Sequence, residues 1–181
     1  MKPIYARLGI HIWLLTGLPI IAGAAEAPGF SLESVGARIG GSGTDRAHDF
    51  HQAEAFVNCN LPWKWDLGKD WRLQSRFDLS GGWLADPGRD AAIVTAGPSL
   101  LLGKAQFPLS FEGGASPTLI SRHEFETKDF GTPFQFTSHL GLNLDWRHYR
   151  VGYRFQHMSN AGISDRNPGL NLHVIALSYL F

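Results

Sequence analysis

The feature that most constrains this chain is an alternation of apolar and polar residues that recurs in strand-length segments. In FQFTSHLGLNLDW, residues 134–146, every second position from Phe134 to Trp146 is apolar except Ser138, whereas the positions between them include Gln135 and Asp145. Successive side chains of a β-strand point to opposite faces of the sheet. Each such segment is therefore predicted to be a strand with one apolar face and one polar face.

The same pattern predicts eight strands. The segment at 91–102 alternates least clearly of the eight. Short connections near 104–106 and 147–148 contrast with longer ones at 122–133 and 160–169, which are rich in the turn-forming residues Gly, Pro, Asp and Asn. The predicted strands are 31–43, 50–61, 71–84, 91–102, 107–121, 134–146, 149–159 and 170–181.

Two all-β architectures compete for such strands. A soluble sandwich or lipocalin-like barrel buries the apolar faces, whereas a transmembrane barrel turns them outward to lipid. The strands, of about 10 to 13 residues, are long enough to cross a bilayer when tilted. The polar faces carry charges of both signs, which a small closed barrel can pair inside but a soluble core cannot easily hold. Aromatic residues gather near strand ends, as in interfacial girdles: Trp71, Trp83, Phe134, Trp146, Tyr149 and Tyr179.

We therefore predict an all-β fold, an eight-stranded antiparallel transmembrane β-barrel. Side chains fill the interior of so small a barrel, so a pore is not expected. The chain ends in SYLF, and a terminal aromatic residue after an alternating strand resembles the assembly signal of bacterial outer-membrane barrels. An even number of strands places both termini on the periplasmic side and the long connections outside.

The N-terminal residues have the order of an export signal. Lys2 and Arg7 precede an apolar run, LGIHIWLLTGLPIIAG, and then small residues, AGAAEA. Basic, apolar and small residues in that order are typical of a secretory signal peptide. We expect a signal peptide at 1–25 and an outer-membrane β-barrel domain at 26–181. A retained membrane anchor is the alternative, although the run is short for a span.

Composition argues against several other classes of function. Lys and Arg together number 16, as do Asp and Glu, so the formal net charge is +0 and nothing indicates binding to nucleic acid. Cys59 is the single cysteine, which excludes an internal disulfide framework and a Cys-rich zinc site.

One predicted strand departs from the pattern at its end. In HYRVGYRFQHMSNAG, residues 148–162, the apolar face that begins at Tyr149 ends in His157 and Ser159. Residues two apart lie about 7 Å apart on one face, so imidazole and hydroxyl can lean into the hydrogen bond that nucleophilic catalysis requires. Asn171 has the same parity at the facing end of the next strand. Short polar residues at strand ends are also common as turn starters, and spacing alone leaves that alternative open.

The surrounding stretch, FQHMSNAGISDRNPGLN at 155–171, closely resembles the signature of the PagL-type lipid A deacylases (the acyloxyacyl hydrolase family). That family pattern is H-x-S-N-A-G, then an Asn a few residues later, then an acidic residue near the start of the last strand. The resemblance implies a small outer-membrane barrel with its active site facing lipid. The specific match is confined to this stretch, and the barrel pattern supports it elsewhere.

The resemblance implies a role for each residue of the motif. Ser159 is expected to be the nucleophile that attacks an acyl ester carbonyl, and His157 the general base and then the acid for the leaving alkoxide. The expected oxyanion-stabilising groups are Asn160, the backbone amides around Ala161 and Gly162, and Asn167. Asn and Gly are also ordinary loop formers.

The chain departs from the family pattern at the acidic position, which maps by spacing to Asn171. An amide oxygen can accept a hydrogen bond from histidine and hold its tautomer, but it supplies no charge to the imidazolium. A slower enzyme is therefore expected, and an inactive relative is the alternative. Asp165, in the same loop, is a second candidate for the acidic partner.

Two weaker constellations lie in the predicted loops. His123, Glu124 and Glu126 are candidate metal ligands, but their spacing matches no known ligand set and favours a solvated loop. Basic residues of the outer loops are candidate ligands for lipid A phosphates: Arg46, Arg89, Arg122, Lys128 and Arg166.

We expect an outer-membrane serine esterase that removes a fatty-acyl chain, 3-O-linked, from lipid A of lipopolysaccharide. The expected partner is lipopolysaccharide in the outer leaflet, with no nucleic acid, cofactor or metal, and a homodimer is compatible with this reading. The alternatives are a non-catalytic structural or binding barrel and a phospholipase on the same scaffold. Loss of turnover in Ser159→Ala would distinguish an enzyme from a binding protein.

Overall fold

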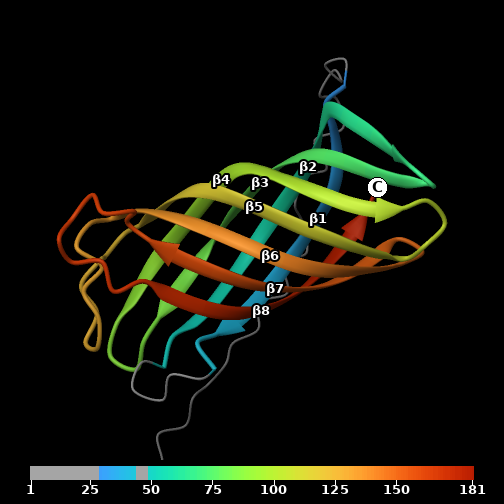
Figure 1. Cartoon of the computed structure of the whole chain (residues 1–181). Helices are drawn as coiled ribbons and strands as arrows, with labels where there is room; N and C mark the ends of the chain where they lie inside the picture. The colour runs from blue at the N-terminus through green and yellow to red at the C-terminus, as the bar shows by residue number, and fades with distance from the viewer. Residues whose placement is uncertain (1–28, 44–48) are drawn as a thin grey trace, which may run out of the picture.

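The described residues form a closed barrel of eight antiparallel strands, as predicted (Figure 1). A computed structural model describes residues 29–43 and 49–181, so the predicted signal peptide lies outside the described residues. Each strand pairs with its neighbours in sequence, and β8 closes the barrel against β1. The strands are β1 (Ser31–Gly41), β2 (His51–Gly68), β3 (Trp71–Ala85), β4 (Asp90–Lys104), β5 (Leu109–Ile120), β6 (Phe134–Trp146), β7 (Tyr149–Ser159) and β8 (Leu170–Leu180).

The second strand is longer than predicted, since it continues beyond residue 61 to Gly68. Its pairing with β1 ends at Asn60, whereas its pairing with β3 resumes after a register shift at Lys64. Pro62 lies in that irregular segment, and because proline cannot donate to a ladder it obscures the strand in the sequence. The two strands form a hairpin that extends past the barrel wall (Figure 1).

The apolar faces of the strands point outward. Along β7, Arg150, Arg154 and Gln156 are buried inside the barrel, whereas the alternate positions such as Val151 and Phe155 are exposed. This arrangement confirms the predicted choice of a transmembrane barrel over a soluble one, because large apolar side chains cover the outer surface. No helix in the described ranges is long and apolar enough to cross a membrane.

Several charged residues inside the barrel are paired, whereas the buried carboxylate of Asp78 has no hydrogen-bond partner among the described residues. Glu112 accepts hydrogen bonds from Arg76 at 2.9 Å and from Asn143 at 3.0 Å, and it also pairs with Arg154 at 2.7 Å. Elsewhere Arg38 donates to Glu54. Buried charges are stabilised by such partners, so this network accounts for Arg76, Glu112 and Arg154 of the predicted polar face.

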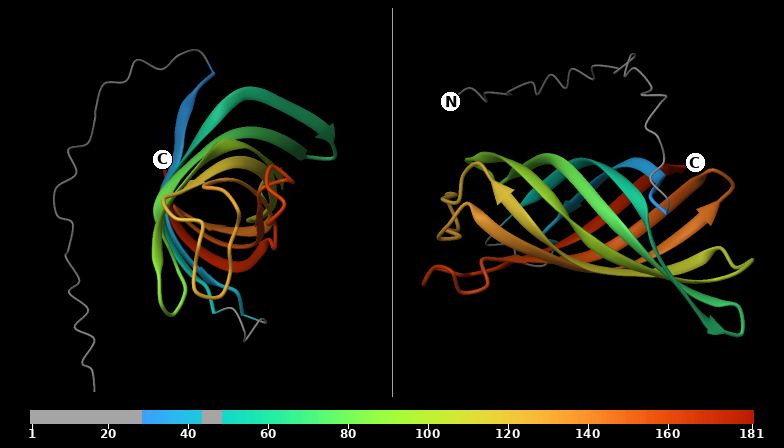
Figure 2. Two further views of the ribbon diagram at one scale, coloured as in Figure 1. Left: turned by 90° about the vertical axis from the view of Figure 1, so that its left-hand side faces the viewer. Right: turned by 90° about the horizontal axis from the view of Figure 1, so that it is seen from above.

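The two ends of the barrel differ (Figure 2). The loop end carries the facing ends of β1 and β2 and the connections at 86–89, 121–133 and 160–169, and the turn end carries the short turns and the C-terminus. At the turn end Tyr179 contacts Tyr149 and Phe181 edge to face, with ring centroids 5.8 Å and 5.3 Å apart. These aromatic residues form part of the predicted interfacial girdle.

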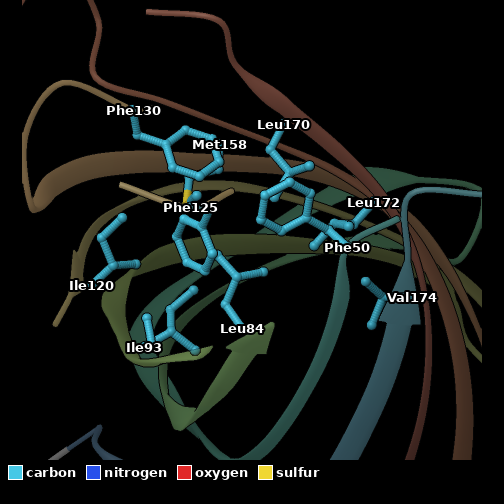
Figure 3. Packing of buried hydrophobic residues seen from close by; sticks show 11 residues of the cluster. Phe50, Leu84, Ile93, Ile120, Phe125, Phe130, Met158, Leu170, Leu172 and Val174 are labelled. Carbon is cyan, nitrogen blue, oxygen red and sulfur yellow. The ribbon is translucent and has the colours of Figure 1, made fainter. Parts of the chain in front are cut away.

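An apolar cluster, not foreseen from the sequence, fills the interior at the loop end (Figure 3). Phe125 and Phe130, from the loop at 121–133, pack edge to face with Phe50, with ring centroids 5.1 to 5.8 Å apart. Met158 and Leu172 join them from the inward faces of β7 and β8. The cluster fixes the loops against the strands and gives the loop end a rigid base.

Candidate active site

The predicted catalytic residues lie on the outer face of the barrel at its loop end. His157 is paired in register with Ser138 on β6 and with Asn171 on β8. Ser159 is the last residue of β7 and is half-buried. The strand register therefore places all three side chains on the face that also presents the apolar residues of β7 and β8.

Asn171 is the hydrogen-bond partner of His157. The His157 Nδ1 atom lies 2.7 Å from Asn171 Oδ1. An amide oxygen can only accept, so Nδ1 carries the proton and Nε2 is left as a proton acceptor. Asp165, the other candidate, is exposed and has no recorded hydrogen bond in the described part of the chain. The geometry thus assigns the orienting position to an amide.

Ser159 and His157 are adjacent outward-facing positions of β7, about 7 Å apart along the strand. Within the described residues no hydrogen bond joins them, which is usual for catalytic pairs without substrate. Gly169 lies close to the Cε1 atom of the imidazole. A Cβ atom at this position would lie 2.9 Å from His157 Cε1, and the φ angle of +64° also favours glycine. The histidine ring is therefore held between Asn171 and the end of the 160–169 loop.

Asn160, predicted to stabilise an oxyanion, is fully buried beneath the loop. Its Nδ2 group donates to the carbonyl oxygens of Phe130, at 2.9 Å, and Arg166, at 2.7 Å. Its Oδ1 atom accepts from the Gly162 amide at 2.9 Å. Because these bonds occupy the side chain, the geometry favours a role in shaping the loop, and the Gly162 N–H is likewise engaged.

Two other groups predicted to stabilise the oxyanion, the Asn167 side chain and the Ala161 backbone amide, retain hydrogen-bond donors. Asn167 Oδ1 accepts from the Asn160 backbone N–H at 3.0 Å, which fixes the amide plane and leaves Nδ2 without a recorded partner among the described residues. The backbone N–H of Ala161, a residue with a φ angle of +54°, also has none there. Hydrogen-bond donors held in this way are what an oxyanion requires.

Three consecutive residues of the 121–133 loop hold the 160–169 loop. Lys128 Nζ donates to the Gly169 carbonyl at 2.9 Å, Asp129 pairs with Arg166, and the Phe130 carbonyl accepts from Asn160. The hydrogen bond from Arg166 holds the pKa of Asp129 at about 2, and a bond from the Gly131 amide also lowers it. Lys128 and Arg166, predicted as phosphate ligands, thus serve the loop scaffold.

Asp86 anchors the same scaffold from the 86–89 connection. Its Oδ2 atom accepts from the Glu126 amide at 2.9 Å, and its Oδ1 atom accepts from the Arg89 amide at 2.7 Å. Burial raises the pKa of this carboxyl, but the backbone hydrogen bonds outweigh that effect and lower it. Arg89 Nη1 in turn donates to the Glu124 carbonyl at 3.1 Å. Arg46 lies outside the described residues, and Arg122 is exposed.

The predicted metal candidates are only partly brought together. His123 and Glu124 place ligand atoms within 4.8 Å of each other and of Asp129, which takes the position expected of Glu126. His123 Nδ1 lies 3.1 Å from Asp129 Oδ1, and Arg166 holds the other carboxylate oxygen. The guanidinium already supplies the positive charge that a metal would bring.

A first groove of about 520 Å³ opens on the outer face beside His157. Gly113 and Gly114 of β5 line it together with Leu140 and Phe155, and Ser138 lies across from the histidine. Gly113, at an outward position of β5, has no side chain to fill the space beside Leu140 and so leaves a channel between larger apolar neighbours. An apolar chain lying in this groove has one end at the imidazole, which is the geometry that cleavage of an acyl ester needs.

Comparisons with known proteins agree with this fold. The sequence model of the family described as lipid A 3-O-deacylase (PagL) matches residues 51–180. Lipid A deacylase PagL of Bordetella bronchiseptica is 32% identical over 138 residues, which cover 72% of this chain and 78% of that protein. The crystal structure of the outer membrane enzyme PagL superposes with a TM-score of 0.70 at 19% identity, covering 81% of this chain and 98% of the other.

Proposed function

Because the chain belongs to the lipid A 3-O-deacylase (PagL) family, we propose that it is an outer-membrane esterase that removes the 3-O-linked fatty-acyl chain of lipid A. The observation that carries this proposal is the 2.7 Å hydrogen bond between His157 and Asn171 on the outward, apolar face of the barrel. In an outer-membrane barrel the short turns face the periplasm, so the loop end faces outward and the pair lies at the level of the outer leaflet. A water-soluble substrate has poor access to that position, whereas a lipid ester lies beside it.

In the first step the Ser159 hydroxyl attacks the carbonyl carbon of the acyl ester while His157 Nε2 takes the hydroxyl proton. Asn171 Oδ1 holds Nδ1–H and so keeps Nε2 unprotonated. The tetrahedral oxyanion is stabilised by the donors left without partners, Asn167 Nδ2 and the Ala161 amide.

Collapse of this intermediate breaks the bond to the sugar oxygen, which takes the proton from His157 and leaves as the 3-hydroxyl. The acyl group stays on Ser159 as an ester. A water molecule then attacks that ester, gives its proton to His157, and returns the serine hydroxyl with release of a free fatty acid. Every residue with a role in this mechanism belongs to one protein chain, so the mechanism requires only a monomer.

The first groove would hold the acyl chain that is cleaved. Within a bilayer the chain gains little from leaving lipid, because lipid is as apolar as the groove. Binding in the groove instead helps catalysis by orienting the substrate, because an acyl chain fixed along Leu140 and Phe155 keeps its ester carbonyl beside Ser159.

The mechanism is tested by labelling the refolded protein with a fluorophosphonate probe and locating the label by peptide mass spectrometry. We expect modification of Ser159, and loss of both label and hydrolysis in Ser159→Ala. The matched control is Ser31→Ala at the turn end, which should retain both. Label at another serine, or hydrolysis by Ser159→Ala, would refute the proposed nucleophile, and cleavage of glycerophospholipid in place of lipid A would favour a phospholipase.

A further inference from the structure

A second hollow, of about 530 Å³, lies on the outer face at the loop end, across β8, β1, β2 and β3. Its floor is made of small residues that share the outward parity of adjacent strands, Gly41, Ala53 and Ala85. Ile39 and Trp83, which are large and exposed, rise on either side of this floor. The small residues between larger ones therefore form an apolar channel on an outer surface that otherwise carries large side chains.

The hollow changes from polar to apolar along its length. His51 and His173 lie at the loop end, and His51 Nε2 is 3.3 Å from Asp49 Oδ1. Ile39 and Ile175 line the part nearer the middle of the barrel. A ligand with a polar head and an apolar tail fits this gradient, with its head toward the loops.

The second hollow and the first groove share a wall next to the catalytic pair. His173, which lines the hollow, stands two residues after Asn171 on the same face, and its Nδ1 atom is 2.7 Å from the Tyr153 hydroxyl. Its ring meets the Phe155 ring edge on, with centroids 5.3 Å apart, and Phe155 lines the first groove beside His157. One ridge of three rings therefore separates the two hollows.

We propose that the second hollow binds another fatty-acyl chain of the same lipid A molecule, one that the enzyme does not cleave. The inference rests on the proposed function. Lipid A carries several acyl chains on one headgroup, and a headgroup placed over the ridge sends chains down both sides. Packing in the hollow then sets the rotation of the headgroup and selects which ester reaches Ser159.

The test fills the floor of the hollow with Ala53→Leu and, separately, Ala85→Leu. Both substitutions add apolar atoms on the lipid-facing surface, so the barrel should still fold. The matched control is Ala96→Leu, an outward position of β4 that lines neither hollow. Each purified protein is assayed on lipid A and on a p-nitrophenyl ester of a single fatty acid, with heat-modifiable migration as the check of folding.

We expect kcat/KM on lipid A to fall about tenfold in both filled variants, because small misplacements of a reacting group are costly. The single-chain ester should be cleaved at the unaltered rate, and Ala96→Leu should match the parent protein on both substrates. Unchanged lipid A turnover in the filled variants, or an equal fall on both substrates, would overturn the inference. If the parent protein cleaves the simple ester but not lipid A, the proposed function fails and the inference falls with it.

Discussion

Replacing Asn171 by Asp tests how the enzyme works without the acidic residue of its family. The substitution exchanges the amide nitrogen for an oxygen and keeps an acceptor 2.7 Å from His157 Nδ1. It therefore adds charge without moving the histidine. When Ser159 attacks, His157 becomes a cation, and a carboxylate would stabilise that cation better than an amide does.

The expected gain follows from hydrogen-bond energies. A bond between neutral groups contributes roughly 0.5–1.5 kcal/mol and one to a charged group roughly 1.5–3 kcal/mol. The difference, about 1–1.5 kcal/mol, corresponds to about a tenfold rise in kcat. Replacing the triad acid of a serine protease by its amide lowers kcat by about 10⁴-fold because that change also reverses the tautomer. In this protein Asn171 Oδ1 already holds His157 in the productive tautomer, so we expect the tenfold change in kcat and not the 10⁴-fold one.

The assay measures initial rates of fatty-acid release from lipid A by the parent protein, Asn171→Asp and Asn171→Ala. We expect a faster Asp variant and an Ala variant slowed about tenfold or more, because it loses the acceptor. Equal rates in all three folded proteins would show that Asn171 does not orient the base. A slower Asp variant would refute the argument from charge.

Three further results are expected. Asn167→Asp keeps the acceptor for the Asn160 amide but removes the Nδ2 donors, so steady-state kinetics should show kcat about 10²-fold lower with little change in KM. Glu112→Ala leaves Arg76 and Arg154 without their shared partner and should lower the free energy of unfolding in urea by about 3–5 kcal/mol. Because Arg166 lowers the pKa of Asp129 from 3.8 to about 2, the stability from its carboxylate is complete above about pH 4 and is lost as the pH falls through 2. Hydrogen exchange at the Gly131 amide should report that loss, and Asp129→Asn should abolish the pH dependence.

Much of the fold follows from the sequence because parity along a strand is a local property. The alternation from Phe134 to Trp146 identified both the strand and its outward face, and the structure retains the predicted bounds. Where proline and a register shift break the alternation, as at Pro62, the extension of β2 to Gly68 could not be read. The apolar interior at the loop end was also missed, although the inward parity of Leu172 and Val174 is a signal that could have indicated it.

In the candidate site, too, some features could be predicted from the sequence and others could not. The pairing of His157 with Asn171 was predictable from parity and from the facing strand ends, and the structure brings them together. The roles of Lys128 and Asp129 could not be predicted. Their contacts join the 121–133 loop to the 160–169 loop, between residues about 40 positions apart, and depend on the closed barrel. The use of Asn160 as a loop anchor likewise depends on the Phe130 carbonyl, which no local pattern reveals.

The most direct test of the central claim is mass spectrometry of lipid A from Gram-negative cells that express the protein, beside cells that express Ser159→Ala. The account predicts loss of one 3-O-linked hydroxy-acyl chain in the first sample and none in the second. Unchanged lipid A in both samples, with the parent protein folded in the outer membrane, would contradict it and favour a non-catalytic barrel.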